Sequence, residues 1–215
     1  MNHSIKGLAG KARQGKDTAG CYLANKLGVP TYSFAQPIKE YIHALCGWGD
    51  YRNYEDVKEK PHRVIITLDD LEAAAIVAER SGLASYVRQR KGGFFIKDVL
   101  EHLGLETGYD KITYKTPREL YQLFGTEYGR QFVDYNIWVE LMPLQDVVIT
   151  DVRFPNEAAA IRASGGQVIH ISRDNTKVGL SGHESEQTLP IMKGDAVIDN
   201  SGTLEELYAK LDKLL

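Results

Sequence analysis

The sequence is poor in cysteine and has no surplus of charge of either sign. Cys21 and Cys46 are the only cysteines among 215 residues, and they do not lie at a metal-ligand spacing. We therefore predict two reduced thiols in a reducing compartment and no disulfide framework. The 26 basic and 29 acidic residues leave a net charge of −3, so the chain as a whole carries no electrostatic footprint for nucleic acid.

Long apolar runs are missing as well. None approaches the roughly 20 residues that cross a bilayer, and residues 1–6 lack the apolar region of a signal peptide. We expect a cytoplasmic protein that has neither a membrane nor a nucleic acid as its partner.

Short apolar runs alternate instead with amphipathic segments. The strand candidates are residues 3–10, 31–34, 146–150, 167–172 and 195–200, and helix candidates at 16–28, 155–165 and 203–215 follow three of them. This alternation predicts an α/β fold with a central parallel sheet and right-handed crossovers. A chain of this length can bury a substantial core without metal or disulfide support.

The pattern becomes irregular over residues 48–115, which we interpret as a mostly helical insertion. A long amphipathic stretch over residues 69–90 predicts a helix that Gly82 interrupts, with Asp69 or Asp70 as its cap. Regular order returns beyond the insertion. There, Thr116 with Glu119 predicts a capping box at the start of the next helix.

The stretch GLAGKARQGKDTAG, residues 7–20, has the glycine and lysine spacing of a phosphate-binding loop. Gly10 and Gly15 permit a tight backbone whose N–H groups can hold phosphate oxygens, and Lys16 can reach the β- and γ-phosphates. Asp17 stands where such loops carry Ser or Thr, and Thr18 follows it. The alternative is a chance glycine turn before a helix.

The chemistry of this loop allows a working site despite Asp17. A carboxylate is a hard oxygen ligand for Mg²⁺, and the Thr18 hydroxyl can still bind a phosphate or the ion. Arg13 lies inside the loop, where it could place a cation at a transferred phosphoryl group. An ordinary solvated arginine is the alternative for Arg13.

Asp151 ends the apolar run of a predicted central strand, where an acidic residue can orient Mg²⁺ or its waters. Arg153 would point into the same crevice at the carboxyl edge of the sheet. The alternative for Asp151 is a cap of the following helix.

Further candidates flank that strand. Arg118 and Arg130 suit phosphate recognition but could equally lie on solvated helix faces, and Trp138 is either a core residue or a platform for a base. Residues 173–190 are polar and contain glycine, as expected of a mobile lid or of an ordinary loop. Its cations are Arg173, Lys177 and His183, and we expect His183 to be structural, since phosphoryl transfer depends more on charge placement than on a base.

Taken together, six segments resemble the phage-type deoxynucleoside monophosphate kinases, in which the Lys-Asp-Thr form of the loop is the norm. The resemblance covers the first 45 or so residues and nearly everything from Thr116 onward. The segments are KARQGKDTAG, SFAQPIKE, LFGTEYGRQFVDYNIWV, TDVRFPNEAAAIRASGGQVIHISR, HESEQTLP and GDAVIDNSGTLEELYAKL.

The resemblance implies a P-loop, nucleoside-monophosphate-kinase-like fold with three α/β/α layers, formed by residues 1–215 as a single domain. It implies ATP as phosphoryl donor with Mg²⁺, a deoxynucleoside monophosphate as acceptor, a homodimer, and the host cytoplasm if a phage encodes the chain. The resemblance does not extend to the insertion at 48–115, which we expect to bind the acceptor or act as a lid, and we expect residues 173–190 to form a lid loop.

The resemblance also implies roles for individual residues. Catalytic roles fall to Lys16, Arg13, Arg118 and Arg153. Donor binding falls to Gly10, Gly15, Lys16, Asp17, Thr18 and Arg173, and metal binding to Asp17, Thr18 and Asp151. Acceptor binding falls to Lys39, Arg118, Arg130, Trp138, Asp151, Arg153 and Glu157.

Two other functions are compatible with the same residues. One is a kinase of another small phosphorylated metabolite, such as a phosphomevalonate kinase, because that family also carries a Gly-Lys-Asp loop. The other is a regulator that binds a nucleotide without transferring phosphate.

Overall fold

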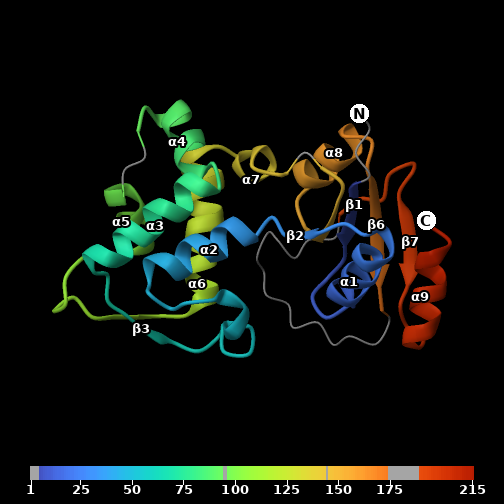
Figure 1. Cartoon of the computed structure of the whole chain (residues 1–215), viewed down its shortest axis with the longest axis horizontal. Helices are drawn as coiled ribbons and strands as arrows, with labels where there is room; N and C mark the ends of the chain where they lie inside the picture. The colour runs from blue at the N-terminus through green and yellow to red at the C-terminus, as the bar shows by residue number, and fades with distance from the viewer. Residues whose placement is uncertain (1–4, 94–95, 144, 174–188) are drawn as a thin grey trace. The chain divides into compact units, whose positions relative to one another are not determined.

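The computed structural model describes residues 5–93, 96–143, 145–173 and 189–215. The chain divides into two compact units (Figure 1). Unit 1 comprises Met1–Phe34 and Pro143–Leu215, and unit 2 comprises Ala35–Met142.

Unit 1 contains a five-stranded sheet in the order β2-β5-β1-β6-β7. Every neighbouring pair is parallel, which confirms the predicted parallel sheet. The strands are β1 (Ile5–Ala9), β2 (Thr31–Tyr32), β5 (Val147–Val152), β6 (Gln167–Ser172) and β7 (Ala196–Asp199).

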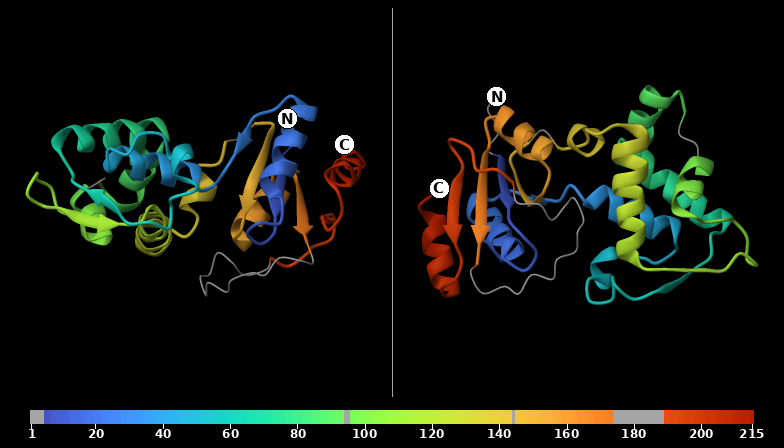
Figure 2. Two further views of the ribbon diagram at one scale, coloured as in Figure 1. Left: turned by 90° about the horizontal axis from the view of Figure 1, so that it is seen from below. Right: turned by 180° about the vertical axis from the view of Figure 1, so that it is seen from behind.

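Helices cover both faces of this sheet (Figure 2). Successive side chains of a strand point to opposite faces, and β1 shows both environments. Leu8 packs in a core cluster with residues of α1 (Lys16–Leu27) and α9 (Leu204–Asp212), whereas Gly7 lies against Ile161 of α8 (Pro155–Ala163). The three α/β/α layers expected from the sequence are therefore present.

The parallel arrangement places the candidate residues of unit 1 at one edge of the sheet. Because all five strands run in the same direction, the segments that follow their carboxyl ends share that edge. The glycine loop follows β1, Ser33 follows β2, Arg153 follows β5, Arg173 follows β6 and Asn200 follows β7.

Unit 2 is largely helical, with one short antiparallel pair of strands, β3 and β4. Its aromatic core includes Tyr41 and Phe124, which stack with ring centroids 4.5 Å apart. The elements of this unit are α2 (Gln36–Leu45), η1 (Tyr51–Tyr54), β3 (His62–Val64), α3 (Leu68–Arg80), α4 (Leu83–Lys91), α5 (Ile96–Leu103), β4 (Thr113–Lys115), α6 (Pro117–Gln122), η2 (Leu123–Val133) and α7 (Ile137–Glu140).

Helix α3 begins earlier than its sequence indicated. Its cap is Thr67, whose hydroxyl accepts from the Asp70 amide at 3.3 Å while the Asp70 carboxylate accepts from the Thr67 amide at 2.9 Å. The assignment of Asp69 or Asp70 as the cap was therefore wrong, because Asp70 fills the reciprocal position of the capping box. Gly82, with a φ of +78°, separates α3 from α4 as expected.

The helix that follows Thr116 departs further from expectation. The Thr116 hydroxyl accepts from the Glu119 amide at 3.0 Å, as predicted, but the Glu119 carboxylate pairs with Lys115 at 2.6 Å. After only six residues α6 passes into η2, an 11-residue π-helix. Long π-helices are rare and often occur at functional sites, and the apolar spacing gave no indication of this one.

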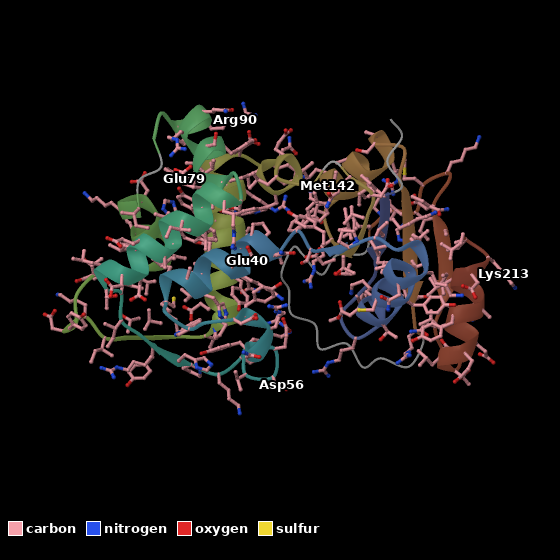
Figure 3. All side chains as sticks on the ribbon, in the orientation of Figure 1. Glu40, Asp56, Glu79, Arg90, Met142 and Lys213 are labelled. Atoms are coloured by element: carbon pink, nitrogen blue, oxygen red, sulfur yellow. The ribbon has the colours of Figure 1, made fainter. Side chains whose placement is uncertain are left out.

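The predicted insertion at 48–115 lies within unit 2, which spans residues 35–142 and is therefore longer than the insertion. The boundaries of the insertion stay a prediction. Glu79 of α3 and Arg90 of α4, both labelled in Figure 3, are exposed and form ion pairs with Arg88 and Asp134 respectively. Every helix within the described ranges is too short or too polar to span a bilayer.

Candidate functional site

The loop between β1 and α1 needs glycine at both motif positions, Gly10 and Gly15. A Cβ on Gly10 would lie 2.3 Å from the carbonyl oxygen of Ile171, and one on Gly15 would lie 2.4 Å from Nδ2 of Asn200. Both glycines also have positive φ angles, +148° and +92°, which other residues rarely adopt. Steric fit and backbone geometry thus both explain the glycine spacing.

Two hydrogen bonds form within the loop. Oε1 of Gln14 accepts from the Lys11 amide at 2.6 Å, and Nζ of Lys16 donates to the Lys11 carbonyl at 2.8 Å. Among the described residues no side chain caps the first turn of α1. The amides of that turn and the positive end of the helix dipole therefore remain available to an anion.

Arg13 is the one described non-glycine residue with a positive φ, +63°. Its side chain is exposed. A residue held in this unfavourable backbone region is a feature of tight functional loops, and it favours a role for Arg13 in the loop without assigning one.

Lys16 is 8% exposed, and its surroundings tune its charge. Burial, followed by the positive charge of Arg153, lowers the pKa of Lys16 to about 8, while the carboxylates of Asp17 and Asp151 act in the opposite direction. The structure thus brings together the loop lysine, both predicted carboxylates and Arg153. These four groups form the charged centre of the candidate site.

Both oxygens of the Asp151 carboxylate are fixed by the end of β2. Oδ2 accepts from the Ser33 hydroxyl at 2.6 Å, and Oδ1 accepts from the Phe34 amide at 2.7 Å. Asp151 does not take the alternative role of a cap of α8, because the N-cap of that helix is Phe154 and its third residue is Glu157. Oε2 of Glu157 accepts from the amides of Arg153 at 2.7 Å and Phe154 at 3.0 Å.

Glu157 is 2% exposed. Its hydrogen bond from the Arg153 amide fixes the backbone that carries the Arg153 side chain. The acceptor-binding role inferred for Glu157 from the resemblance stays a prediction.

The oxygen donors of unit 1 suit a magnesium ion that is bound jointly by the protein and by substrate phosphates. Asp17 and Thr18 are exposed and Asp151 is half-buried. The described part of the chain has no group of three or more His, Cys, Asp or Glu that could cage a metal. Mg²⁺ in phosphoryl-transfer sites uses one or two carboxylates together with waters and substrate phosphates, and Asp17 with Asp151 meets that requirement.

Arg173, at the end of β6, is exposed, and its Nε donates to the Asn200 carbonyl at 2.8 Å. Residues 174–188 lie outside the described residues. The predicted lid loop and its cations Lys177 and His183 therefore lie there too, and only Arg173, Leu189 and Pro190 of the segment are described.

Two acceptor candidates in unit 2 contact the same short segment, residues 55–59. Nζ of Lys39, on α2, pairs with the Glu55 carboxylate at 2.7 Å. The Arg118 amide donates to the Lys58 carbonyl at 3.0 Å, and the Arg118 guanidinium donates to the Glu59 carboxylate. The fold thus brings Lys39 and Arg118, 79 positions apart in the chain, to one region of unit 2.

The other two acceptor candidates in unit 2 are buried. Trp138 is 1% exposed, and its indole N–H donates to the Gly125 carbonyl at 2.7 Å. Arg130 is 7% exposed, and its Nη1 donates to the Tyr135 carbonyl at 3.0 Å. This placement favours the core alternative for Trp138, and substrate-binding roles for both residues stay predictions.

Sequence reasoning missed two residues that shape the loop, Gln14 and Asn200. Nδ2 of Asn200 donates to the Gln14 carbonyl at 2.9 Å, and Asn200 is 2% exposed. The sequence did contain a signal for Asn200, because the polar residues Asn-Ser-Gly at 200–202 directly follow an apolar strand. A residue at that point lies at the carboxyl edge of a parallel sheet.

A glycine loop that leads from β1 into α1, a buried lysine at the start of that helix, and an aspartate at the end of the adjacent strand define a P-loop nucleotide-binding protein. Residues 96–211 match the family described as deoxynucleotide monophosphate kinase. This chain belongs to the deoxynucleotide monophosphate kinase family, since the match covers more than half of its length.

Individual relatives agree with this assignment over nearly the whole chain. The deoxynucleotide monophosphate kinase of Escherichia phage RB69 is 29% identical, covering 97% of this chain and 98% of the relative. That of Enterobacteria phage T4 is 28% identical, covering 97% of each. The deoxynucleoside-5'-monophosphate kinase of Escherichia phage T5 is 29% identical, covering 86% of this chain and 85% of the relative.

Proposed function

We propose that this protein transfers the γ-phosphoryl group of ATP to a deoxynucleoside 5'-monophosphate. An oxygen of the acceptor phosphate forms the new bond to the γ-phosphorus, the bond to the bridging oxygen breaks, and ADP leaves. The single observation that carries the proposal is the buried Lys16 in the glycine loop, grouped with Arg153, Asp17 and Asp151. Family membership implies the kinase chemistry.

In this proposal unit 1 binds the donor. The loop amides and the first turn of α1 hold the β- and γ-phosphates, and the Lys16 ammonium contacts their oxygens. Arg13 and Arg153 offset the charge that spreads over the equatorial oxygens in the transition state. Arg173 contributes to donor binding, and Glu157 keeps Arg153 in place through the backbone.

Asp17, Thr18 and Asp151 would hold Mg²⁺ together with the donor phosphates. When bound, the ion would neutralise phosphate charge and align the oxygens of donor and acceptor. The hydrogen bonds from Ser33 and Phe34 pre-orient the Asp151 carboxylate for this role.

The acceptor phosphate is assigned to unit 2. Lys39 and Arg118 supply the cations, and both are already tied to residues 55–59. A guanidinium matches a phosphate with two parallel hydrogen bonds, and in this proposal Arg118 binds the acceptor phosphate and also offsets charge on the transferred group. Arg130 and Trp138 complete the acceptor side as inferred from the resemblance.

ADP release tests the proposal directly. Purified protein with ATP and Mg²⁺ is offered each of the four natural deoxynucleoside monophosphates and their ribose counterparts, with products identified by mass. We expect turnover with one or more deoxynucleotides and little ADP without an acceptor, and the assay then also gives the base and sugar preference.

Two outcomes would replace the proposal. Turnover only with another phosphorylated metabolite, such as phosphomevalonate, would make the protein a different small-molecule kinase. Tight ATP binding without product on any acceptor would make it a nucleotide-binding regulator.

The homodimer implied by the resemblance is also proposed here. Light scattering coupled to size-exclusion chromatography should give twice the 24.1 kDa mass of the chain, and a mass equal to one chain would contradict it.

A further inference from the structure

Asn200 joins three segments at the carboxyl edge of the sheet. Its amide donates to the Ser172 carbonyl at 2.7 Å, and its carbonyl accepts from Nε of Arg173 at 2.8 Å. Its side-chain Nδ2 donates to the Gln14 carbonyl inside the glycine loop at 2.9 Å. The backbone of Asn200 is therefore fixed to the end of β6, and its side chain is fixed to the loop.

The hydrogen bond from Asn200 to the Gln14 carbonyl determines which way the Gly15 N–H of the same peptide points. In a planar trans peptide the C=O and N–H groups are antiparallel. Holding the Gln14 carbonyl toward Asn200 therefore aims the Gly15 N–H away from Asn200. Gly15 has a φ of +92° and no side chain, so the intrinsic resistance to rotation of this peptide is low.

The contact is tight as well as polar. A Cβ on Gly15 would lie 2.4 Å from Nδ2 of Asn200, so the amide of Asn200 occupies the volume beside this glycine. Asn200 is 2% exposed and Gln14 is 9% exposed, and the hydrogen bond between them is thus shielded from competing water.

We propose that Asn200 is a positioning residue that locks the Gln14–Gly15 peptide in the orientation that binds phosphate. If this peptide rotated, a carbonyl oxygen would replace an N–H donor in the cradle and would repel an anion. The Asn200 side chain prevents that rotation because its amide hydrogen holds the carbonyl on the opposite side. This inference rests on the proposed donor-binding role of the loop and extends it to a residue from the last strand.

The test is Asn200→Asp, which keeps the shape of the side chain but removes the donor. We expect the Kd of ATP to rise about 10- to 100-fold, because the Gln14 carbonyl loses its buried partner and the peptide is free to rotate. The KM of the acceptor should be unchanged. Inorganic tripolyphosphate should lose affinity in parallel with ATP, because the effect concerns the phosphates.

Two further variants make the result interpretable. Asn25→Asp makes the same change in charge at an exposed position of α1 and should leave the Kd of ATP unchanged. Asn200→Ala removes the donor without adding charge, and serves if the aspartate variant does not fold by circular dichroism. A general loss of structure would instead raise the KM of both substrates and lower the melting temperature in proportion.

ATP affinity within about twofold of the wild type in folded Asn200→Asp or Asn200→Ala would overturn the inference. That result is distinguishable from failure of the proposed function. If the wild-type protein binds ATP but phosphorylates no deoxynucleotide, the kinase assignment falls, while weakened ATP binding in the Asn200 variants would still uphold the positioning role.

Discussion

At the scale of single residues, the buried position of Lys16 links donor binding to pH. Burial and the nearby Arg153 lower its pKa to about 8, so the free protein loses the Lys16 charge as the pH rises through 8. We expect the Kd of ATP to rise about tenfold per pH unit above pH 8, since only the charged form is competent to bind phosphate. Binding measured between pH 7 and pH 10 checks this.

The lowered pKa of Lys16 also makes the stability of the fold depend on pH. The folded pKa lies below the unfolded value of 10.5, so between these values the unfolded chain binds more protons and stability rises with pH. The stabilisation from neutral Lys16 is complete above about pH 10.5 and is lost as the pH falls through 8.

The control for the binding prediction is Lys16→Arg, which stays charged between pH 7 and pH 10. If the ATP affinity of this variant still fell with rising pH, the effect would belong to another group.

The roles of residues were partly readable from the sequence. Gly10, Gly15 and Lys16 could be placed because a phosphate loop imposes a fixed spacing on adjacent residues. Glu157 could not be read in the same way, because its hydrogen bonds to the Arg153 and Phe154 amides depend on local backbone geometry. Asn200 was missed because its partner in the loop lies 186 positions away.

At the scale of elements, an ion pair connects α8 with the segment that enters β7. Arg162 donates to Asp195 through Nε at 2.9 Å and through Nη2 at 2.7 Å, and His170 of β6 lies 3.0 Å from the same carboxylate. The Asp195 side chain is 1% exposed. The Arg162 guanidinium, together with the Met192 amide and His170, holds the pKa of the Asp195 carboxyl well below its usual range.

We expect Asp195→Asn to lower the free energy of unfolding by about 2–4 kcal/mol, because it leaves the partly buried Arg162 without its counterion. Chemical denaturation at pH 7 measures the change. A depressed carboxyl pKa stabilises the fold above about pH 4, and the contribution is lost as the pH falls further, so the variant and the wild type should converge in acid. Asp212→Asn, which disrupts an exposed pair with Lys26, should cost less than about 1 kcal/mol; an equal effect of both would contradict the prediction.

The π-helix η2 is a second element whose packing can be tested. A Cβ on Gly129 would lie 2.6 Å from Cζ2 of Trp138 and 3.1 Å from the Phe124 carbonyl oxygen. We expect Gly129→Ala to destabilise the fold by about 1–3 kcal/mol, because overpacking must displace the buried indole. Denaturation followed by tryptophan fluorescence in a Trp48→Phe background reports on Trp138 directly. Glu127→Ala, at an exposed position of the same helix, should be nearly neutral, and equal stability of the two variants would refute the packing argument.

The elements of the two units differ in how well the sequence predicted them. The apolar runs of β5 and β6 and the helix patterns of α8 and α9 emerged because period and length are local properties. The π-helix could not be inferred, because its apolar residues are compatible with an α-helix and the choice depends on contacts such as Gly125 against Ile38 and Gly129 against Trp138. The Thr67 cap was missed for a simpler reason, since either Asp70 or Thr67 can cap a helix.

At the scale of the whole molecule, the candidate residues divide between the two units. Lys16 and its neighbours belong to unit 1, whereas Lys39 and Arg118 belong to unit 2. The donor role proposed for Gly10, Gly15 and Lys16 follows from a contiguous motif. The acceptor role proposed for Lys39 and Arg118 rests on resemblance alone, because tertiary folding brings these two residues to residues 55–59.

This division predicts separable defects in the two substrates. Arg118→Ala should raise the KM of the deoxynucleoside monophosphate about 10- to 100-fold, the loss expected for a charge-assisted hydrogen bond to phosphate, and leave the Kd of ATP unchanged. Lys16→Ala should weaken ATP and lower kcat by about 10²- to 10³-fold without weakening the acceptor. Steady-state kinetics with each substrate varied in turn measures both.

The matched control is Arg88→Ala, because Arg88 also lies in unit 2 and pairs with a surface carboxylate, that of Glu79, at 2.6 Å. Loss of either surface pair should cost little stability, so a kinetic defect specific to Arg118 cannot come from its bond to Glu59. If Arg118→Ala weakened ATP as strongly as the acceptor, Arg118 would contact the phosphates of bound ATP, and the assignment of acceptor binding to this arginine would fall. If Arg118→Ala and Arg88→Ala had equal kinetics, Arg118 would be an ordinary surface arginine, and the search for the acceptor phosphate site would move to Lys39 and Arg130.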